Sequence, residues 1–168
     1  MPTTPFPTAP ASGEVIEIER ALSRITYLIS RARQHDRLVA VAGVPLDRAA
    51  TGVLRQIADG EPRRPGELAA RLGVEASHVT RTVQQLQRVG YVSRVPDPDD
   101  RRAQRIELTE EGGRAIARIR DAGARGMQQA LADWTPEELR QFATLFHRMV
   151  DDFLEYAEDD AEPQPDTV

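Results

Sequence analysis

Two short amphipathic helix patterns that meet at a glycine constrain this chain most, and they lie in residues 65–90. The first pattern opens at Pro65, which suits the first position of a helix, and closes at Gly73, which suits the position just after one. The second pattern covers residues 76–89 and repeats apolar side chains such as Val79 at the spacing of a helix face. Two short helices joined by a tight turn predict a helix-turn-helix unit.

The second helix of this unit carries hydrogen-bonding side chains on the side that faces away from its apolar residues. At about 100° per residue from Val79, these side chains point away from the predicted core. They can read base edges in the major groove of DNA, although the solvated face of any surface helix has a similar composition. The set consists of Ser77, Arg81, Gln84, Gln85 and Arg88, with His78 to one side.

Two alternating segments follow, at residues 91–95 and 105–108, and they predict an antiparallel β-hairpin. The connection, residues 96–102, reads PDPDDRR and gives the hairpin a charged tip. A helix-turn-helix followed by such a hairpin is a winged helix, in which a helix enters the major groove while wing arginines reach the minor groove or phosphates. The order of the patterns therefore favours a DNA-binding function.

The distribution of charge agrees with a nucleic-acid partner, although the whole chain has a net charge of -5. Residues 62–108 hold nine arginines against six acidic residues, whereas the rest of the chain holds 13 against 21. A basic segment between acidic arms can mark a DNA-binding face on an acidic protein. All 22 cationic residues are arginine, which suits bidentate contacts to phosphate and guanine.

Apolar stripes with helical spacing mark both ends of the chain. The first stripe follows Glu14, and the second follows Thr135, where Thr-Pro-Glu-Glu supplies an N-cap, a first-turn proline and a capping-box glutamate. A third long helix is expected over residues 109–131, and Asp47 can cap a shorter helix that stops near Gly60. Each stripe needs a partner, either within the chain or across a two-fold dimer axis. The stripes are Ile18, Leu22, Ile25 and Ile29, and Leu139, Phe142, Phe146, Met149 and Phe153.

Short motifs in and around the helix-turn-helix carry a resemblance to a known family. They are Glu67-Leu68-Ala69, Leu72-Gly73-Val74, Val79-Thr80-Arg81 with Leu86, Gly90-Tyr91-Val92, the run R-x-x-D-x-x-D-R-R from Arg94 to Arg102, and Ile106-x-Leu108-Thr109. With these motifs, residues 14–156 resemble the MarR family of bacterial transcription regulators (multiple antibiotic resistance regulators). The resemblance implies a mainly α fold with a small β-hairpin wing, long terminal dimerisation helices, and a homodimer that binds double-stranded DNA.

The expected organisation of the chain has a central domain and flanking segments. The winged helix-turn-helix domain covers residues 46–108, a dimerisation helix with its connection covers 14–45, and further dimerisation helices cover 109–157. The ends, residues 1–13 and 158–168, combine proline with small polar or acidic residues. Because such segments bury too little apolar surface to offset their ordering entropy, both are expected to be disordered tails.

The resemblance also implies roles for individual residues. Arg102 corresponds to a wing-tip arginine that enters the minor groove, and Asp100 to a carboxylate that braces the wing through a salt bridge. Two departures are present: Glu75 occupies a position where an N-capping Ser or Asp is more usual, and Asp97 with Asp99 adds negative charge expected to reduce nonspecific affinity. Implied nearest the bases are Ser77, His78 and Arg81, nearer the backbone are Thr80, Thr82 and Arg94, and the predicted DNA-binding set also includes Gln84, Gln85, Arg88 and Arg101.

Family members often release DNA when a small anionic aromatic compound binds between the dimerisation helices and the winged helix. The resemblance therefore adds a phenolic or other aromatic effector to the expected partners. Tyr27, Arg31 and His35, expected on the helix that follows Glu14, could border such a pocket, but a tyrosine and an arginine there more often pack and pair with their neighbours. For that reason, none of these three residues is assigned to a ligand-binding site.

Features that are missing from the sequence narrow the function further. Without cysteine there is no thiolate metal site or thiol switch, and the three histidines are far apart in sequence. No phosphate-binding glycine loop or hydrolase signature is present, so we expect neither an enzyme nor a cofactor or metal. The absence of a long apolar run and of a secretory signal predicts a soluble, cytoplasmic protein. The alternative to a DNA-binding regulator is a winged helix used for protein contacts, which would usually lack arginines on both helix and wing.

Overall fold

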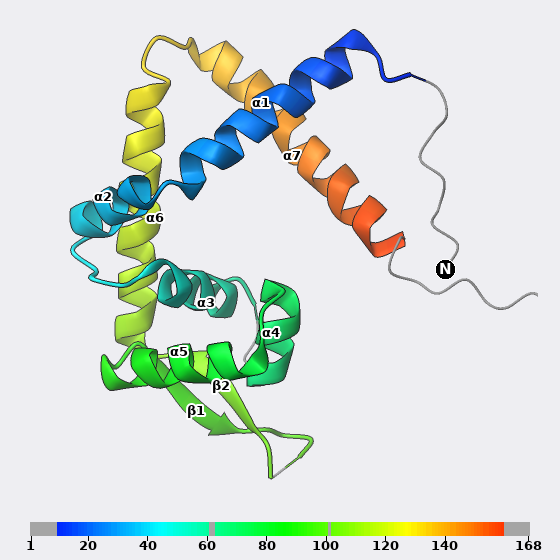
Figure 1. Cartoon of the computed structure of the whole chain (residues 1–168). Coiled ribbons are helices and arrows are strands. Elements are labelled where there is room, and N and C mark those ends of the chain that lie inside the picture. The colour runs from blue at the N-terminus through cyan, green and yellow to red at the C-terminus, as the bar shows by residue number, and fades with distance from the viewer. Residues whose placement is uncertain (1–9, 61–62, 101, 160–168) are drawn as a thin grey trace, which may run out of the picture. The chain divides into compact units, whose positions relative to one another are not determined.

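The computed structural model describes residues 10–60, 63–100 and 102–159, which form helices and one β-hairpin (Figure 1). They fall into two compact units, one made of residues 19–128 and the other of residues 10–18 and 129–159. The mainly helical fold with a two-stranded wing is the one predicted from the sequence. The elements are α1 (Gly13–Ser30), α2 (Ala32–Ala42), α3 (Arg48–Ala58), α4 (Pro65–Leu72), α5 (Ala76–Arg88), β1 (Val92–Pro96), β2 (Gln104–Leu108), α6 (Glu110–Ala130) and α7 (Pro136–Asp159).

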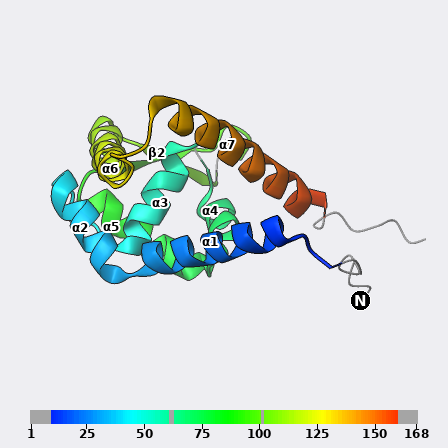
Figure 2. The ribbon, with the colours of Figure 1, turned by 90° about the horizontal axis from the view of Figure 1, so that it is seen from above.

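The core of the larger unit lies where α3, α4, α5, the hairpin and the first half of α6 pack together. In both views of the ribbon, α3 lies against α4 and α5 (Figure 1, Figure 2). Leu54, Leu68 and Leu86, one from each of these helices, are fully buried, as are Ile106 of β2 and Ile119 of α6. Burying one such side chain contributes roughly 1.5–3 kcal/mol to folding. The core therefore holds the two helices of the turn unit and the wing together.

Local sequence signals set the ends of these helices. Asp47 caps α3, because its Oδ1 accepts a hydrogen bond of 2.7 Å from the amide of Ala50. Helix α4 ends at Gly73, whose φ of +62° is a conformation that glycine adopts without strain. Helix α5 then begins at Ala76. The predicted helix-turn-helix is confirmed.

The wing has the predicted antiparallel strands, with Val92 paired to Leu108 at the base. A further pairing was not anticipated from the sequence. Arg63 donates from its amide to the carbonyl of Ile106 (3.3 Å) and accepts from the amide of Ile106 (2.8 Å). The segment that leads into α4 therefore binds the outer edge of β2.

The N-terminal helical region differs from the prediction, because it is divided at Arg31. The backbone of Arg31 is extended, with φ −68° and ψ 129°. The guanidinium group of Arg48 donates a hydrogen bond of 2.9 Å to the carbonyl of Ser30 and a second one to the carbonyl of Ile29. A cation at this position stabilises the negative end of the helix dipole. As a result of the break, His35 lies on α2 and not on the first helix.

The two C-terminal helices begin where the sequence predicts. Helix α6 follows Thr109, and its Gly112 approaches Tyr91 so closely that an added Cβ would lie 1.9 Å from the Tyr91 carbonyl oxygen. Helix α7 opens with the predicted capping box: Thr135 Oγ1 accepts from the amide of Glu138 (3.2 Å), and Glu138 Oε2 accepts from the amide of Thr135 (2.8 Å). These contacts fix the first turn of each helix.

Both terminal helices leave most of their apolar stripes exposed. No side chain of α1 is buried, and Leu22 is the half-buried member of its stripe. In α7, Met149 is half-buried and the other described side chains are exposed. Within the described part of the chain, no helix is long and apolar enough to span a bilayer. The exposed members of the two stripes are Ile18, Ile25, Ile29, Leu139, Phe142, Phe146 and Phe153.

Candidate nucleic-acid interface

Helix α5 has one polar face in solvent and one apolar face in the core. Val79, Val83 and Leu86 are fully buried on the apolar face. The polar face carries two guanidinium groups together with a hydroxyl, an imidazole and an amide, and side chains of these types can bind base edges in a major groove. The exposed predicted residues are Ser77, His78, Arg81, Gln84 and Arg88.

Three other predicted residues of α5 have different surroundings. Thr82 is 7% exposed, and its hydroxyl donates a hydrogen bond of 3.0 Å to the carbonyl of His78. Thr80 is half-buried and donates to a carbonyl one turn earlier (2.9 Å). Gln85 is half-buried and its Nε2 lies 3.4 Å from Asp47 Oδ2. About 60° from Val79 on the helix, the Thr82 side chain therefore faces the core, and its place near a DNA backbone stays a prediction of the resemblance.

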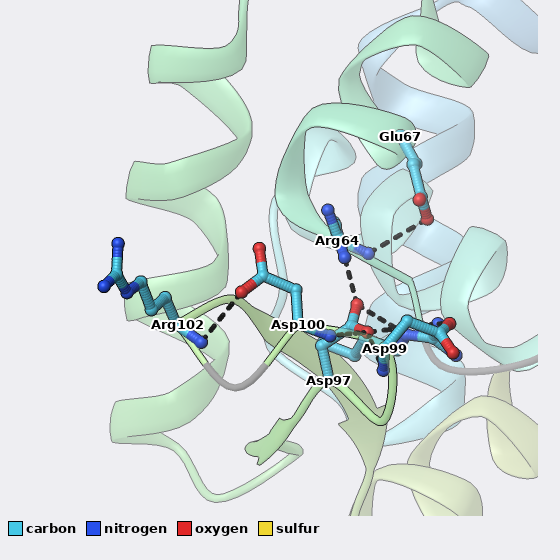
Figure 3. Close-up of polar contacts among 7 residues, drawn as sticks. Arg64, Glu67, Asp97, Asp99, Asp100 and Arg102 are labelled. Carbon is cyan, nitrogen blue, oxygen red and sulfur yellow. Dashed lines mark hydrogen bonds and ion pairs between the residues drawn. The ribbon is translucent and has the colours of Figure 1, made fainter.

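A buried carboxylate holds the wing to α4. Asp97 follows β1 and is 1% exposed, and its Oδ2 lies 2.6 Å from Arg64 Nε and 2.9 Å from Arg105 Nε (Figure 3). Its Oδ1 accepts hydrogen bonds from the amides of Asp99 (2.9 Å) and Asp100 (3.3 Å). Because one arginine precedes α4 and the other lies on β2, this carboxylate joins α4, the second strand and the hairpin tip.

These contacts set the protonation states of the three groups. The hydrogen bond from Arg64, followed by that from Arg105, lowers the pKa of Asp97 far below its ordinary value, although burial acts in the opposite direction. The hydrogen bond to Asp97 raises the pKa of each arginine. The carboxylate and both guanidinium groups are therefore charged at neutral pH.

The residue that braces the wing differs from the expected one. The resemblance implies a salt bridge from Asp100, and the sequence places unusual negative charge beside the wing at Asp97 and Asp99. In the structure Asp97 makes the bracing ion pairs, and Asp99 Oδ2 lies 2.9 Å from Arg105 Nη2. Asp100 orders the tip, because its Oδ1 accepts a hydrogen bond of 3.0 Å from the amide of Arg102. Spacing within the wing does not reveal the bracing pair, since the partner Arg64, directly before α4, lies 33 residues away from Asp97 in the sequence.

Sequence reasoning missed Arg64 and Arg105, but a signal for Arg105 was available. The hairpin register pairs Val95 with Arg105, and Asp97 lies two residues beyond Val95. Alternation along a strand places Asp97 and Val95 on the same side, so Asp97 is a diagonal neighbour of Arg105. Arg64 offers no comparable signal, because its contact depends on how α4 packs beside the wing.

Three arginines line an open groove between the start of α4 and the wing, with a volume of about 420 Å³. Arg102 at the tip is exposed, and its side chain extends away from Asp97 (Figure 3). Arg94 of β1 is half-buried and donates from Nε to Gln87 Oε1 (3.1 Å). Arg101, also in the predicted set, lies outside the described residues. The lining residues are Arg64, Pro65, Arg94, Arg102, Ala103 and Gln104.

Comparison with known proteins agrees with this arrangement of helix and wing. The model of the MarR family matches residues 44–103, which contain both helices of the turn unit and the tip of the wing. Over 142 residues the chain is 28% identical to the uncharacterized HTH-type transcriptional regulator YxaD of Bacillus subtilis (strain 168), covering 84% of this chain and 95% of the relative. The helix-turn-helix and the wing of this chain are therefore similar to those of the MarR family.

Solved structures show the MarR fold over most of the chain. A MarR family protein from Bacillus stearothermophilus superimposes with a TM-score of 0.74 at 22% identity, covering 87% of this chain and 99% of that one. Transcriptional regulator Tm0710 from Thermotoga maritima gives a TM-score of 0.63 at 26% identity, covering 84% of this chain and 97% of that one. YxaD and Tm0710, to which the chain is similar, are both described as transcriptional regulators, and these similarities support a DNA-binding transcriptional regulator of the MarR type.

Tyr27, Arg31 and His35, which could border an effector pocket, have partners of their own. The Arg31 guanidinium lies 5.9 Å from the centroid of the Tyr27 ring, and His35 Nε2 lies 3.0 Å from the carbonyl oxygen of Leu46. These contacts agree with packing and pairing, and they assign no ligand site. Across residues 10–60, 63–100 and 102–159, no group of three or more His, Cys, Asp or Glu side chains is placed to hold a metal ion.

Proposed function

We propose that this protein is a transcriptional repressor of the MarR type that binds a pseudo-palindromic operator as a homodimer. One observation carries the proposal: an arginine-bearing face of α5 and an arginine-bearing wing belong to the same chain as two long helices with exposed apolar stripes. The first two features supply a surface for duplex DNA. The stripes supply a surface through which two such chains can join.

A second copy of the chain is the partner that best fits the exposed stripes. Ile25 and Ile29 of α1 are 43% and 62% exposed, and Phe142 and Phe153 of α7 are 45% and 56% exposed. Apolar surface of this extent is unusual on a monomer and is typical of a contact between proteins. Because α7 has 24 residues, it is about 36 Å long and can form an extended two-fold interface.

In such a dimer each α5 occupies a major groove, and the two half-sites lie about one helical turn apart. Arg81 on the exposed face of α5 is suited to a bidentate contact with guanine. Arg102 is suited to the adjacent minor groove, where a guanidinium group meets the strongest negative potential. A dimer bound in this way at a promoter blocks access of the polymerase, and because its partner is chromosomal DNA we place the protein in the cytoplasm.

The DNA-binding proposal is tested with the double variant Arg81→Ala/Arg102→Ala. We expect it to lose binding to the duplex that the wild-type protein selects from a randomised pool, and to keep the circular dichroism spectrum of the wild type. The matched control is Arg125→Ala/Arg118→Ala, which removes the same charge from exposed positions of α6. Wild-type binding should also fall steeply with salt concentration. Normal binding by the first variant would refute the proposal.

The dimer proposal is tested by sedimentation velocity on single substitutions in α7. Phe153→Glu places a charge in the exposed apolar stripe and should shift the equilibrium towards monomer. Thr144→Glu adds the same charge about 180° away from the centre of the stripe and should leave the dimer unchanged. Wild-type protein that sediments as a single chain at micromolar concentration would refute the proposed assembly.

Release by a small phenolic or other aromatic ligand is the part of the proposal that rests on the family resemblance alone. Salicylate and related phenols are titrated into the complex of the protein with its selected duplex, and the band shift is followed. Loss of the shift at a concentration that leaves the protein folded supports an effector of this class. A shift that stays constant up to the solubility of each compound excludes those compounds as effectors.

A further inference from the structure

We propose that Asp97 is a positioning residue for DNA binding: it fastens the wing to the start of α4, so that Arg102 meets the duplex at a fixed place relative to α5. The inference rests on the proposed function, because it assumes that Arg102 contacts DNA. It concerns a residue whose charge was expected from the sequence to reduce nonspecific affinity for DNA.

The hairpin beyond its base has few other means of keeping a fixed direction. Each strand has five residues, and a hairpin of two strands is marginally stable by itself. At its base Val92 and Ile106 are buried in the core. Pro96 at the far end of β1 is exposed, so the outer part of the wing depends on polar contacts for its orientation.

The carboxylate of Asp97 is the point where these polar contacts converge. Its own amide donates to the carbonyl of Ala103 (3.1 Å), which closes the tip across the hairpin. Its Oδ1 binds the amides of Asp99 and Asp100, which begin the loop that leads to Arg102. Backbone and side chain of one residue therefore shape the loop from which Arg102 projects.

The contact of Asp97 with Arg64 ties this loop to the body of the protein. Arg64 is the residue directly before α4, and its amide donates to Glu67 Oε2 within the first turn of that helix (3.1 Å). Helix α4 packs against α5 through the core. Contacts through α4, Arg64 and Asp97 thus connect α5, which carries the polar face, to the wing tip (Figure 3).

Asp97 also determines which cations are available to DNA. While it is ionised, it engages Arg64 and Arg105 at 2.6 Å and 2.9 Å. Replacement by asparagine removes one negative charge and both ion pairs of Asp97, which frees Arg64 and leaves Arg105 paired with Asp99 alone. The released charge attracts any duplex, whereas the loosened tip weakens the contact that needs a defined position. The released charge therefore raises the affinity for any duplex, and the loosened tip lowers the affinity for the selected duplex. A general loss of folding would instead lower both affinities.

The experiment measures fluorescence anisotropy with two duplexes, the one that wild-type protein selects from a randomised pool and a scrambled version of it. Asp97→Asn should bind the selected duplex about tenfold more weakly, which is the size of loss typical of one good DNA contact. Its affinity for the scrambled duplex should be unchanged or higher. The matched control is Asp99→Asn, which removes the same charge from a carboxylate that is 80% exposed and pairs with the same Arg105. The control should change the ratio of the two affinities little.

A double-mutant cycle with Arg102→Ala tests whether Asp97 acts through the wing tip. If it does, Asp97→Asn/Arg102→Ala binds the selected duplex about as weakly as Arg102→Ala alone, because the contact that Asp97 positions is already absent. Arg64→Gln provides a second route that leaves the pair between Asp97 and Arg105 in place. It should reproduce the loss in the wild-type background and add little to Arg102→Ala, even if Asp97→Asn proves too unstable to measure.

Three results would overturn the inference while leaving the proposed function intact. The first is that folded Asp97→Asn and Arg64→Gln both keep the wild-type ratio of affinities for the two duplexes. The second is that they lose the same factor of affinity for both duplexes. The third is that the loss in each double variant with Arg102→Ala equals the product of the losses in the two single variants. A different pattern separates failure of the proposed function: wild-type protein that selects no duplex, or Arg102→Ala with unchanged binding, refutes the role of the wing tip and the inference with it.

Discussion

Replacing Gly112 by alanine tests how closely α6 is fitted against the chain that leaves α5. An alanine Cβ at this position would lie 1.9 Å from the carbonyl oxygen of Tyr91 and 2.8 Å from its carbonyl carbon. Since an ordinary contact between carbon and oxygen is about 3.3 Å, the backbone must move by more than about 1 Å. The same carbonyl oxygen accepts a hydrogen bond of 3.1 Å from the amide of Thr109, and this movement would weaken that bond.

The size of the effect follows from three contributions. Overpacking against a backbone group costs about 1–3 kcal/mol, and loss of the hydrogen bond costs about 1 kcal/mol more. Alanine is favoured over glycine inside a helix by about 1 kcal/mol, which offsets part of this cost. We therefore expect Gly112→Ala to lower the free energy of unfolding by about 1–3 kcal/mol. For a chain of this size each kcal/mol lowers Tm by about 2–4 °C.

The assay is thermal unfolding followed by circular dichroism, with all proteins at one concentration because the Tm of a dimer depends on concentration. Gly113→Ala is the matched control, since nothing lies within 4 Å of a Cβ added at that neighbouring residue. It should raise the stability by up to about 1 kcal/mol through helix propensity alone. If Gly112→Ala melts at or above the wild-type temperature while the control behaves as expected, the close fit described above is wrong.

Three further predictions concern stability. The buried hydroxyl of Thr51 has no hydrogen-bond partner among the described residues, so Thr51→Val should raise the free energy of unfolding by about 1 kcal/mol in urea titrations; a decrease would show that the hydroxyl has a partner. Thr135→Ala removes the N-cap of α7 and should lower the free energy of unfolding by about 1 kcal/mol, whereas Thr135→Ser should keep most of the stability that the cap contributes. Equal stability of the two variants would contradict the capping geometry. Because folding lowers the pKa of Asp97, its contribution is complete above the ordinary carboxyl pKa and is lost as the pH falls below it. Wild-type stability should therefore fall more between neutral pH and about pH 3 than that of Asp97→Asn, and parallel curves would argue against the lowered pKa.

The parts of the fold that depend on neighbours in sequence could be predicted from the sequence. The turn at Gly73, the cap of α3 by Asp47 and the capping box at Thr135 each involve residues within one helical turn, and each is present in the structure. Periodicity also identified the buried face of α5, because a helix repeats its direction at a fixed angle. The break at Arg31 could not be found in this way, since the helix end is bound by Arg48 from another helix.

The candidate interface shows the same division. The exposed positions of Arg81 and Arg88 follow from their angles on α5, and the same angles place Thr82 towards the core, whereas correspondence with a family motif had assigned it to the DNA backbone. The role of Asp97 depends on a contact with a residue before α4 and was therefore hidden from motif spacing. Motifs indicated the segment that is proposed to bind DNA, and tertiary contacts decide which of its side chains are free to do so.

The pairing of Arg63 with Ile106 has a consequence for solubility. A projecting hairpin exposes unpaired backbone groups at its edges, and such edges can recruit strands from other molecules and start aggregation. Here the outer edge of β2 is occupied near Ile106 by the chain's own segment. The remaining edge belongs to β1, where Pro96 has no amide hydrogen to offer and Arg94 carries a positive charge. The hairpin that is proposed to contact a duplex is thereby protected against accidental β-sheet growth.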